Sequence, residues 1–217
     1  MKIALAFLIA LLILGYGSSA YGLDDPKVAH AKYDELAAKV RSGDLNVDWQ
    51  EMRLAAEVGG VAGDYDLQDA NQKGIKAFND GKFEDSLKIA AEMIAHNIAN
   101  GDGHFLALIS LTHLGRSAEA NKEHAMLDAF FGSIMRSGDG KTAKTAWFTV
   151  NVHEEYLVIR LLLHMNLKSQ SLSSQNGHSY DVMTVTDDAG KESTLWFNTD
   201  TDIEMMDNAL KASSHKK

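Results

Sequence analysis

The stretch GIKAFNDGKFEDSLKIAAEM, residues 74–93, returns in altered form as LISLTHLGRSAEANKEHAML, residues 108–127. Gly81 in the first copy and Gly115 in the second lie 34 residues apart. A glycine in such a position closes the turn between two helices. The two copies therefore predict two successive helical hairpins, with helices near residues 69–80, 83–99, 103–114 and 117–136.

The period of the two copies resembles that of tetratricopeptide repeats. The residues that fit this pattern are Gly74, Gly81, Phe83 and Ser86 in the first copy and Gly115 and Ala120 in the second. Three features depart from it: Ser117 replaces an aromatic residue, His124 stands where a small residue is usual, and neither copy ends in proline. The alternative is an ordinary antiparallel four-helix segment.

Two further helices precede the copies. The first begins at Pro26, capped by Asp24 or Asp25, and ends before Gly43. Its expected buried face is Ala29, Tyr33, Leu36, Ala37 and Val40. The second runs from about residue 48 to residue 57, with Trp49, Met52 and Ala56 on one side. We expect these two helices to form a hairpin of their own.

The apolar pattern changes to a period of two after the copies. TAWFTVN, residues 145–151, predicts a strand, and Asn151 with Glu154 forms a capping box for a helix that continues to His164. Because this helix is apolar on nearly every side after its first turn, we expect it to lie between the helical hairpins and a sheet.

Three strands are predicted after that helix, near residues 169–175, 178–186 and 192–199. Asn176-Gly177 has the composition of a two-residue hairpin turn. Alternation places Met183, Val185, Leu195 and Phe197 toward the core. A last helix is expected near residues 202–211.

Together these elements predict an α+β fold. Tetratricopeptide-like α-helical hairpins pack on a small, mostly antiparallel C-terminal β-sheet through the buried helix. The expected divisions are a signal peptide at 1–20, a helical region at 24–136, an α/β region at 137–210 and a polar tail at 211–217. The chain has one proline, Pro26, and so has no proline-rich linker that would separate the regions.

The N-terminus has the organisation of a secretory signal peptide. Lys2 precedes an apolar run from Ile3 to Leu14, and small residues follow up to Ala20. This run is shorter than the roughly 20 residues that a membrane-spanning helix needs. We expect cleavage after Ala20 and a periplasmic or secreted protein. Cleavage after Gly22 and a retained N-terminal anchor are the alternatives.

Composition narrows the function classes. The chain has no cysteine, which excludes disulfide bonds and a lipoprotein anchored through a cysteine. The formal net charge is −9, and removal of Lys2 with the signal peptide makes it −10. Nucleic-acid binding needs a clustered positive surface, which this acidic chain with scattered lysines does not offer.

The stretch SGDGKT, residues 137–142, ends like a nucleotide-binding loop. Such a loop needs a glycine five residues before Gly140, where this chain has Met135, and it needs a strand before it and a helix after it. Here the predicted order is helix, then strand. The stretch therefore predicts a helix end at Gly138, in the left-handed conformation, and a turn at Gly140.

Two other motifs resemble metal sites. His153-Glu154-Glu155 begins like a zinc-protease helix, but Leu157 stands where the second histidine is required. Stabilisation of the helix N-terminus by the two glutamates is the simpler interpretation. NTDTD, residues 198–202, lacks the glycine and the final glutamate of a calcium loop. We predict no metal and no cofactor.

Several motifs resemble a known family. YDELAAKV, SGDGKTAKTAWFTV, HEEYLVI, QSL and YDVMTVTD with LWFN are similar to the exported bacterial Domain of Unknown Function 4919 family, and the likeness runs from about Tyr33 to Asn198. The family name implies no reaction. The resemblance implies that certain residues belong together, as a ligand site or as a folding hub. These are Gly138, Asp139, Gly140, Glu155, Tyr156, Gln170, Tyr180 and Asp181.

Two functional hypotheses follow. The first is a non-enzymatic module that binds a protein or peptide on the inner face of the hairpins. That face would consist of Asn71, Ile75, Asn79, Phe105, Ile109 and His113. The alternative is a small-ligand or hydrolytic site formed by Asp139, Lys141, Glu155, Tyr156 and Asp181. The sequence has no recognisable nucleophile arrangement, so we leave catalysis open.

Overall fold

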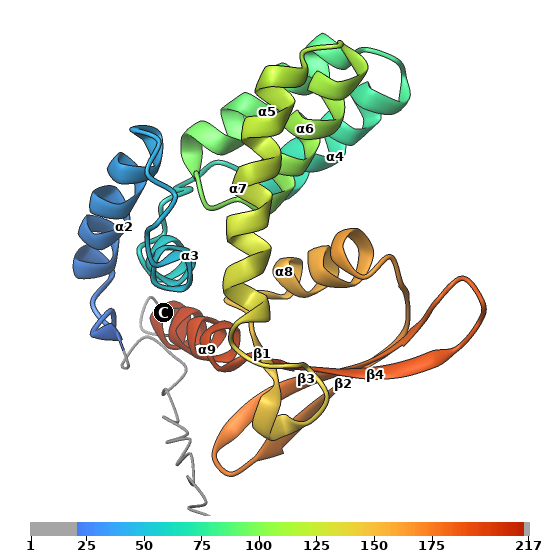
Figure 1. The fold of residues 1–217 in the computed structure, drawn as a ribbon. Coiled ribbons are helices and arrows are strands. Elements are labelled where there is room, and N and C mark those ends of the chain that lie inside the picture. The colour runs from blue at the N-terminus through green and yellow to red at the C-terminus, as the bar shows by residue number, and fades with distance from the viewer. Residues whose placement is uncertain (1–20, 215–217) are drawn as a thin grey trace, which may run out of the picture.

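The computed structural model describes residues 21–214, in which helices are stacked above a sheet (Figure 1). The expected signal peptide at 1–20 lies outside the described residues. The helices are α2 (Pro26–Arg41), α3 (Trp49–Val58), α4 (Leu67–Asn79), α5 (Phe83–His96), α6 (Gly101–His113), α7 (Ser117–Met135), α8 (Val152–Leu157) and α9 (Asp200–Ser214). The strands are β1 (Trp147–Phe148), β2 (Asn166–Gln175), β3 (His178–Thr186) and β4 (Glu192–Asn198).

The first hairpin, α2 and α3, follows the sequence prediction. The Asp25 side chain caps α2 by accepting from the Lys27 amide at 2.8 Å, and Pro26 occupies the first helical position. All five residues expected on the apolar face of α2 are buried. In α3 the expected apolar residues are buried too, but the same face also buries Arg53.

The two repeated segments form the helix pairs α4/α5 and α6/α7, with Gly81 and Gly115 at positive φ in their turns. A second core cluster holds these helices together. Gly74 lets α4 approach α6, because a Cβ there would lie 2.2 Å from Leu106 Cδ2. Helix α5 ends at His96, three residues before the expected end, since Asn97 is extended. The tetratricopeptide likeness stays a prediction.

The glycine-rich turn differs from the expectation at Gly138. Its φ is not positive; Gly140 is the glycine in the left-handed region, with φ 67°. Gly138 is needed for space, because a Cβ there would lie 2.3 Å from the Thr145 carbonyl oxygen. That oxygen accepts from the amides of Asp139 and Gly140 at 3.0 and 2.8 Å. The chain is thus folded back tightly on itself.

This folding back shortens the expected strand at 145–151. Residues 143–145 form a 3₁₀ turn, and only β1 pairs with the sheet, in parallel with β4. The strand ends early because the Val150 amide donates to Glu154 Oε2 at 3.0 Å. The strand order in the sheet is β1-β4-β3-β2, and the pairs β4/β3 and β3/β2 are antiparallel. This mostly antiparallel sheet, together with the helices, confirms the predicted α+β class.

Helix α8 lies between the stacked helices and the sheet (Figure 1). It begins at the predicted cap, where Asn151 Oδ1 accepts from the Glu154 amide at 3.2 Å. The expected regular helix to His164 is wrong. After Leu157 the chain continues as wider π-helical turns over Val158–Leu162, and His164 has a positive φ of 52°.

One hydrophobic core runs through both halves of the molecule. It joins residues of α2, α3 and α7 to residues of α8, β1, β3 and β4. The four strand residues predicted to face the core, Met183, Val185, Leu195 and Phe197, are all buried. Helix α9 packs against β3 and runs to Ser214, beyond the expected start of a polar tail. Over residues 21–214, no helix has the length and apolar character needed to cross a membrane.

Candidate functional site

A groove runs between the inner helices α4 and α6 on one side and α8 with its π-helical extension on the other. Its volume is about 450 Å³. The lining residues are Gln68, Asn71, Gln72, Ile75, Asp102, Phe105, His153, Tyr156, Leu157, Arg160 and Leu161. Three residues of the face predicted from sequence, Asn71, Ile75 and Phe105, therefore meet in one cavity. The guanidinium of Arg160 lies 5.6 Å from the centre of the Tyr156 ring.

The other three residues of the predicted face do not line this groove. Asn79 is exposed at the end of α4, and Ile109 packs on the core between the hairpins. His113 stacks on Phe83 with ring centres 4.6 Å apart. The predicted face is thus split, because His113 packs against an aromatic ring of the same hairpins at their far end.

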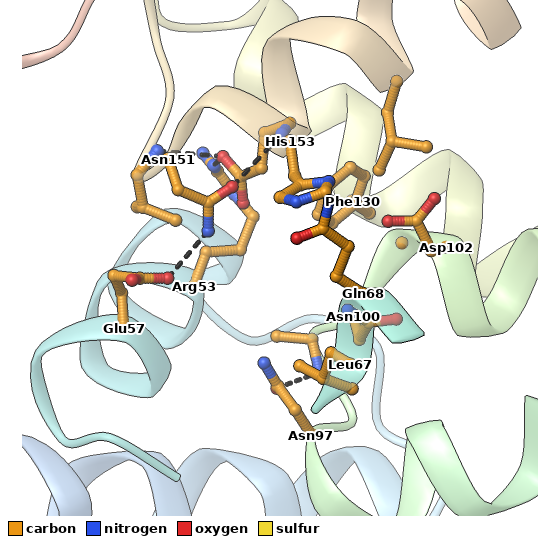
Figure 2. A pocket seen from close by; sticks show the side chains of 15 residues that line it. Arg53, Glu57, Leu67, Gln68, Asn97, Asn100, Asp102, Phe130, Asn151 and His153 are labelled. Atoms are coloured by element: carbon orange, nitrogen blue, oxygen red, sulfur yellow. Dashed lines mark hydrogen bonds and ion pairs between the residues drawn. The ribbon is translucent and has the colours of Figure 1, made fainter. Parts of the chain in front are cut away.

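A smaller cavity of about 100 Å³ continues from the groove toward α3 (Figure 2). The two share Gln68, Asp102, His153 and Leu157. The remaining lining residues of the small cavity are Arg53, Glu57, Leu67, Asn97, Ala99, Asn100, Gly101, Phe130, Val150, Asn151 and Glu154. Figure 2 shows Glu57 and Asp102 on opposite sides of this cavity, with Gln68 and His153 between them.

Arg53 and Glu154 form the buried ion pair of the small cavity. Arg53 is 1% exposed, and its guanidinium donates to Glu154 Oε2, to Ser133 Oγ at 3.0 Å and to the Phe148 carbonyl oxygen at 3.5 Å. Burial raises the pKa of Glu154, and the charge of Arg53 opposes that shift. The positive charge of Arg53 is therefore balanced within the protein.

Two further carboxyl groups of the small cavity, those of Glu57 and Asp102, form no ion pair with a lysine or arginine among residues 21–214. Asn151 Nδ2 donates to Glu57 Oε2 at 2.7 Å, and Asn71 Nδ2 donates to Asp102 Oδ1 at 3.0 Å. Burial raises the pKa of both carboxyl groups. The small cavity is thus lined by three carboxyl groups and one arginine, which is already paired with Glu154, while the charge of Arg160 in the adjoining groove opposes the rise in the pKa of Asp102. Such a cavity favours a cationic or hydrogen-bond-donating group.

The residues of the alternative site separate into two places. Asp139 and Lys141 are exposed in the glycine-rich turn, with Lys141 Nζ 3.4 Å from Asp139 Oδ2. Hydrogen bonds from Thr145 and the Lys141 amide lower the pKa of Asp139. The other three residues lie together where α8 meets the sheet. There Tyr156 Oη donates to Gln170 Oε1 at 2.9 Å, and Gln170 Nε2 donates to Asp181 Oδ2 at 2.5 Å.

Glu155 is at the centre of that second group. It is completely buried, and Thr149 Oγ1 donates to its Oε1 at 3.2 Å. Burial, followed by the nearby Asp181 carboxylate, raises the pKa of Glu155 well above its ordinary value. Glu154 and Glu155 do lie in the first turn of α8, as the sequence interpretation has them, but both are buried: Glu154 pairs with Arg53, and Glu155 lies near Asp181 of the sheet.

Sequence reasoning missed Arg53, Glu57 and Asp102. For Arg53 a signal was present, because it occupies the same helical face as Trp49, Met52 and Ala56. A charged residue on an apolar face predicts a buried partner. No comparable local signal marks Asp102, whose environment depends on α4 and α8.

Metal-like motifs have structural roles within the described range. Asp200 of the NTDTD stretch accepts from the Ser179 amide at 2.7 Å and contacts His178 Nδ1 at 2.6 Å. His104 is buried, contacting Glu123 Oε2 at 2.6 Å and the Ile98 carbonyl oxygen at 2.8 Å. Among residues 21–214 no group of three or more histidine, aspartate or glutamate side chains is placed to hold a metal ion.

The comparisons with known proteins give one result. Residues 64–208 match a protein family described as Domain of unknown function (DUF4919). The chain belongs to this family. The match begins just before α4 and includes every residue that lines the groove, whereas Arg53 and Glu57 of α3 precede it. No curated protein and no solved structure matches the chain.

Proposed function

We propose that this DUF4919 protein is a non-enzymatic module of the cell envelope that binds a segment of a partner polypeptide in the groove between α4, α6 and α8. The observation that supports it best is the convergence of Asn71, Ile75 and Phe105, from two inner helices, with Tyr156 of α8 around one cavity. Half-exposed apolar groups among amide side chains suit a peptide, because the apolar groups bind side chains and the amides bind backbone.

The chemistry of the lining defines the segment. Ile75, Phe105 and Leu161 offer an apolar surface for one side chain. The adjoining small cavity, where, within residues 21–214, the carboxyl groups of Glu57 and Asp102 accept hydrogen bonds only from amides, suits a lysine or arginine side chain that reaches past Asp102. The proposed ligand is therefore an exposed segment that carries an apolar residue beside a basic one.

Export is part of this proposal. It rests on the N-terminal pattern around Ile3–Leu14 and Ala20, which lies outside the described residues. A periplasmic or secreted protein would meet its partner segment in the envelope or in the medium.

The hydrolytic alternative has less support in the arrangement of its residues. Asp139 and Lys141 pair on an exposed turn, while Glu155 and Asp181 are buried where α8 meets the sheet. No specific observation favours this alternative over the groove.

Selection from a library of short random peptides tests the proposal. The purified protein should enrich sequences with an apolar residue beside lysine or arginine. Ile75→Ser should lose most of this enrichment, because it removes an apolar contact from the groove. Val28→Ser is the matched control, since Val28 is an exposed apolar residue of α2, remote from the groove lining. Equal enrichment by wild type and Ile75→Ser would refute the assigned groove.

A further inference from the structure

Glu155 of α8 and Asp181 of β3 are neighbouring buried carboxyl groups. Glu155 is 0% exposed and Asp181 8% exposed. Thr149 Oγ1 donates to Glu155 Oε1, while Oε2 has no hydrogen-bond partner among residues 21–214. Gln170 of β2 donates to Asp181. Two neighbouring carboxyl groups with little water around them cannot both be ionised without strong repulsion.

The charged groups around this pair do not neutralise it. Asp202 of α9 adds a third carboxylate, which shares an unfavourable electrostatic interaction with both members of the pair. Arg53 of α3 is engaged by Glu154, the preceding residue of α8. On the sheet side the neighbour is the neutral amide of Gln170. A proton is therefore the available means of holding Glu155 and Asp181 together.

The pair is connected to the wall of the groove. Tyr156 follows Glu155 in α8, lines the groove, and reaches Asp181 through Gln170. Helix α8 has only six residues before the π-helical turns begin. So short a helix depends on tertiary contacts for its stability. Loss of the contact between Glu155 and Asp181 would thus loosen the groove wall first.

We infer that a proton shared by Glu155 and Asp181 is a latch that holds α8 against the sheet, and that its loss at higher pH releases this wall of the groove. The latch stands independently of any ligand. Its effect on binding rests on the proposed function of the groove.

The direction of the pH dependence follows from the raised pKa of Glu155. A carboxyl group whose pKa is higher in the folded state stabilises that state fully below its ordinary value of 4.5. This contribution is lost as the pH rises from 4.5 toward the folded pKa. Glu155→Gln stays neutral and keeps an amide that donates to Asp181, so it should hold the latch closed at all pH values.

Hydrogen–deuterium exchange of the ligand-free protein tests the latch. After correction for the intrinsic exchange rate, opening of residues 152–163 in the wild type should increase with pH, by up to about tenfold per pH unit once Glu155 ionises. Glu155→Gln should abolish this increase. Glu92→Gln, at an exposed site of α5, is the matched control and should behave like the wild type. The same pH dependence in wild type and Glu155→Gln would overturn the latch.

Infrared spectroscopy of the wild type provides a second readout that does not depend on whether the variant folds. A buried protonated carboxyl band should be present at pH 4.5, the ordinary pKa of a glutamate, and should disappear as exchange at α8 increases with pH. Its absence would also overturn the latch. A peptide affinity that decreases as the pH rises in the wild type, but not in Glu155→Gln, would connect the latch to the groove. If no peptide binds while exchange behaves as expected, the proposed function fails and the latch remains.

Discussion

Arg53 of α3 and Glu154 of α8 form an ion pair buried between the helical hairpins and the sheet. The two residues are 101 positions apart in sequence. Rings of Phe130 and Phe148 lie 5.7 and 6.0 Å from the arginine guanidinium. The pair forms one end of the candidate site, and it joins the N-terminal hairpin to the part of the chain that matches the family.

Arg53→Met should destabilise the protein by about 3–5 kcal/mol, because Glu154 would be left buried without its cation. Urea denaturation at neutral pH measures the change. Arg116→Met is the control: Arg116 forms an exposed ion pair with Glu119, which solvent screens, so its loss should change stability far less than the loss of Arg53. A similar small cost for both variants would show that the Arg53 pair adds no more than a surface contact.

Gly138→Ala should destabilise the protein by about 1–3 kcal/mol, since its Cβ would collide with the backbone at Thr145. Gly43→Ala is the comparison for backbone strain alone. Gly43 has φ 96°, which disfavours alanine, but there is open space around its Cβ position, so no collision is expected. Thermal denaturation compares the two. A stability of Gly138→Ala equal to that of the wild type would contradict the close approach seen here.

Lys141→Ala should change stability by no more than about 0.5 kcal/mol, as expected for an exposed turn residue. The wild-type protein should bind neither ATP nor GTP, because the turn follows a helix and precedes a strand. Calorimetric titration checks both nucleotides. Binding that Lys141→Ala removes would disprove this prediction.

Asp102→Asn should stabilise the protein at pH 7 and weaken binding of the selected basic peptides. The pKa of Asp102 is raised by burial, so ionisation costs stability as the pH rises above its ordinary value of 3.8. The gain in folding stability of Asp102→Asn over the wild type should therefore become smaller as the pH is lowered toward 3.8. Denaturation at several pH values and peptide titration measure the two effects. Undiminished peptide affinity would argue against a cationic ligand group.

The exported protein should begin at Tyr21, with residues 1–20 removed. Intact-mass measurement of the protein recovered from the periplasm or medium checks the cleavage site. A mass that retains the first 20 residues, or recovery only with membranes, would favour the retained anchor.

The amino-acid sequence by itself determined the helices and strands whose signals are local. Pro26 with its aspartate cap, the repeated glycines Gly81 and Gly115, and the Asn176-Gly177 turn all act within a few residues of the chain. Alternation also predicted the buried side of β3 and β4, because the period of a strand depends only on backbone geometry. The α+β class followed from these signals.

Only the tertiary structure decided which charged groups are buried and which cavity they form. Arg53 meets Ser133 and Glu154 across 80 and 101 residues, and Glu155 meets Asp181 where α8 crosses the sheet. Burial and electrostatic interaction arise between segments remote in sequence, so no local pattern specifies them.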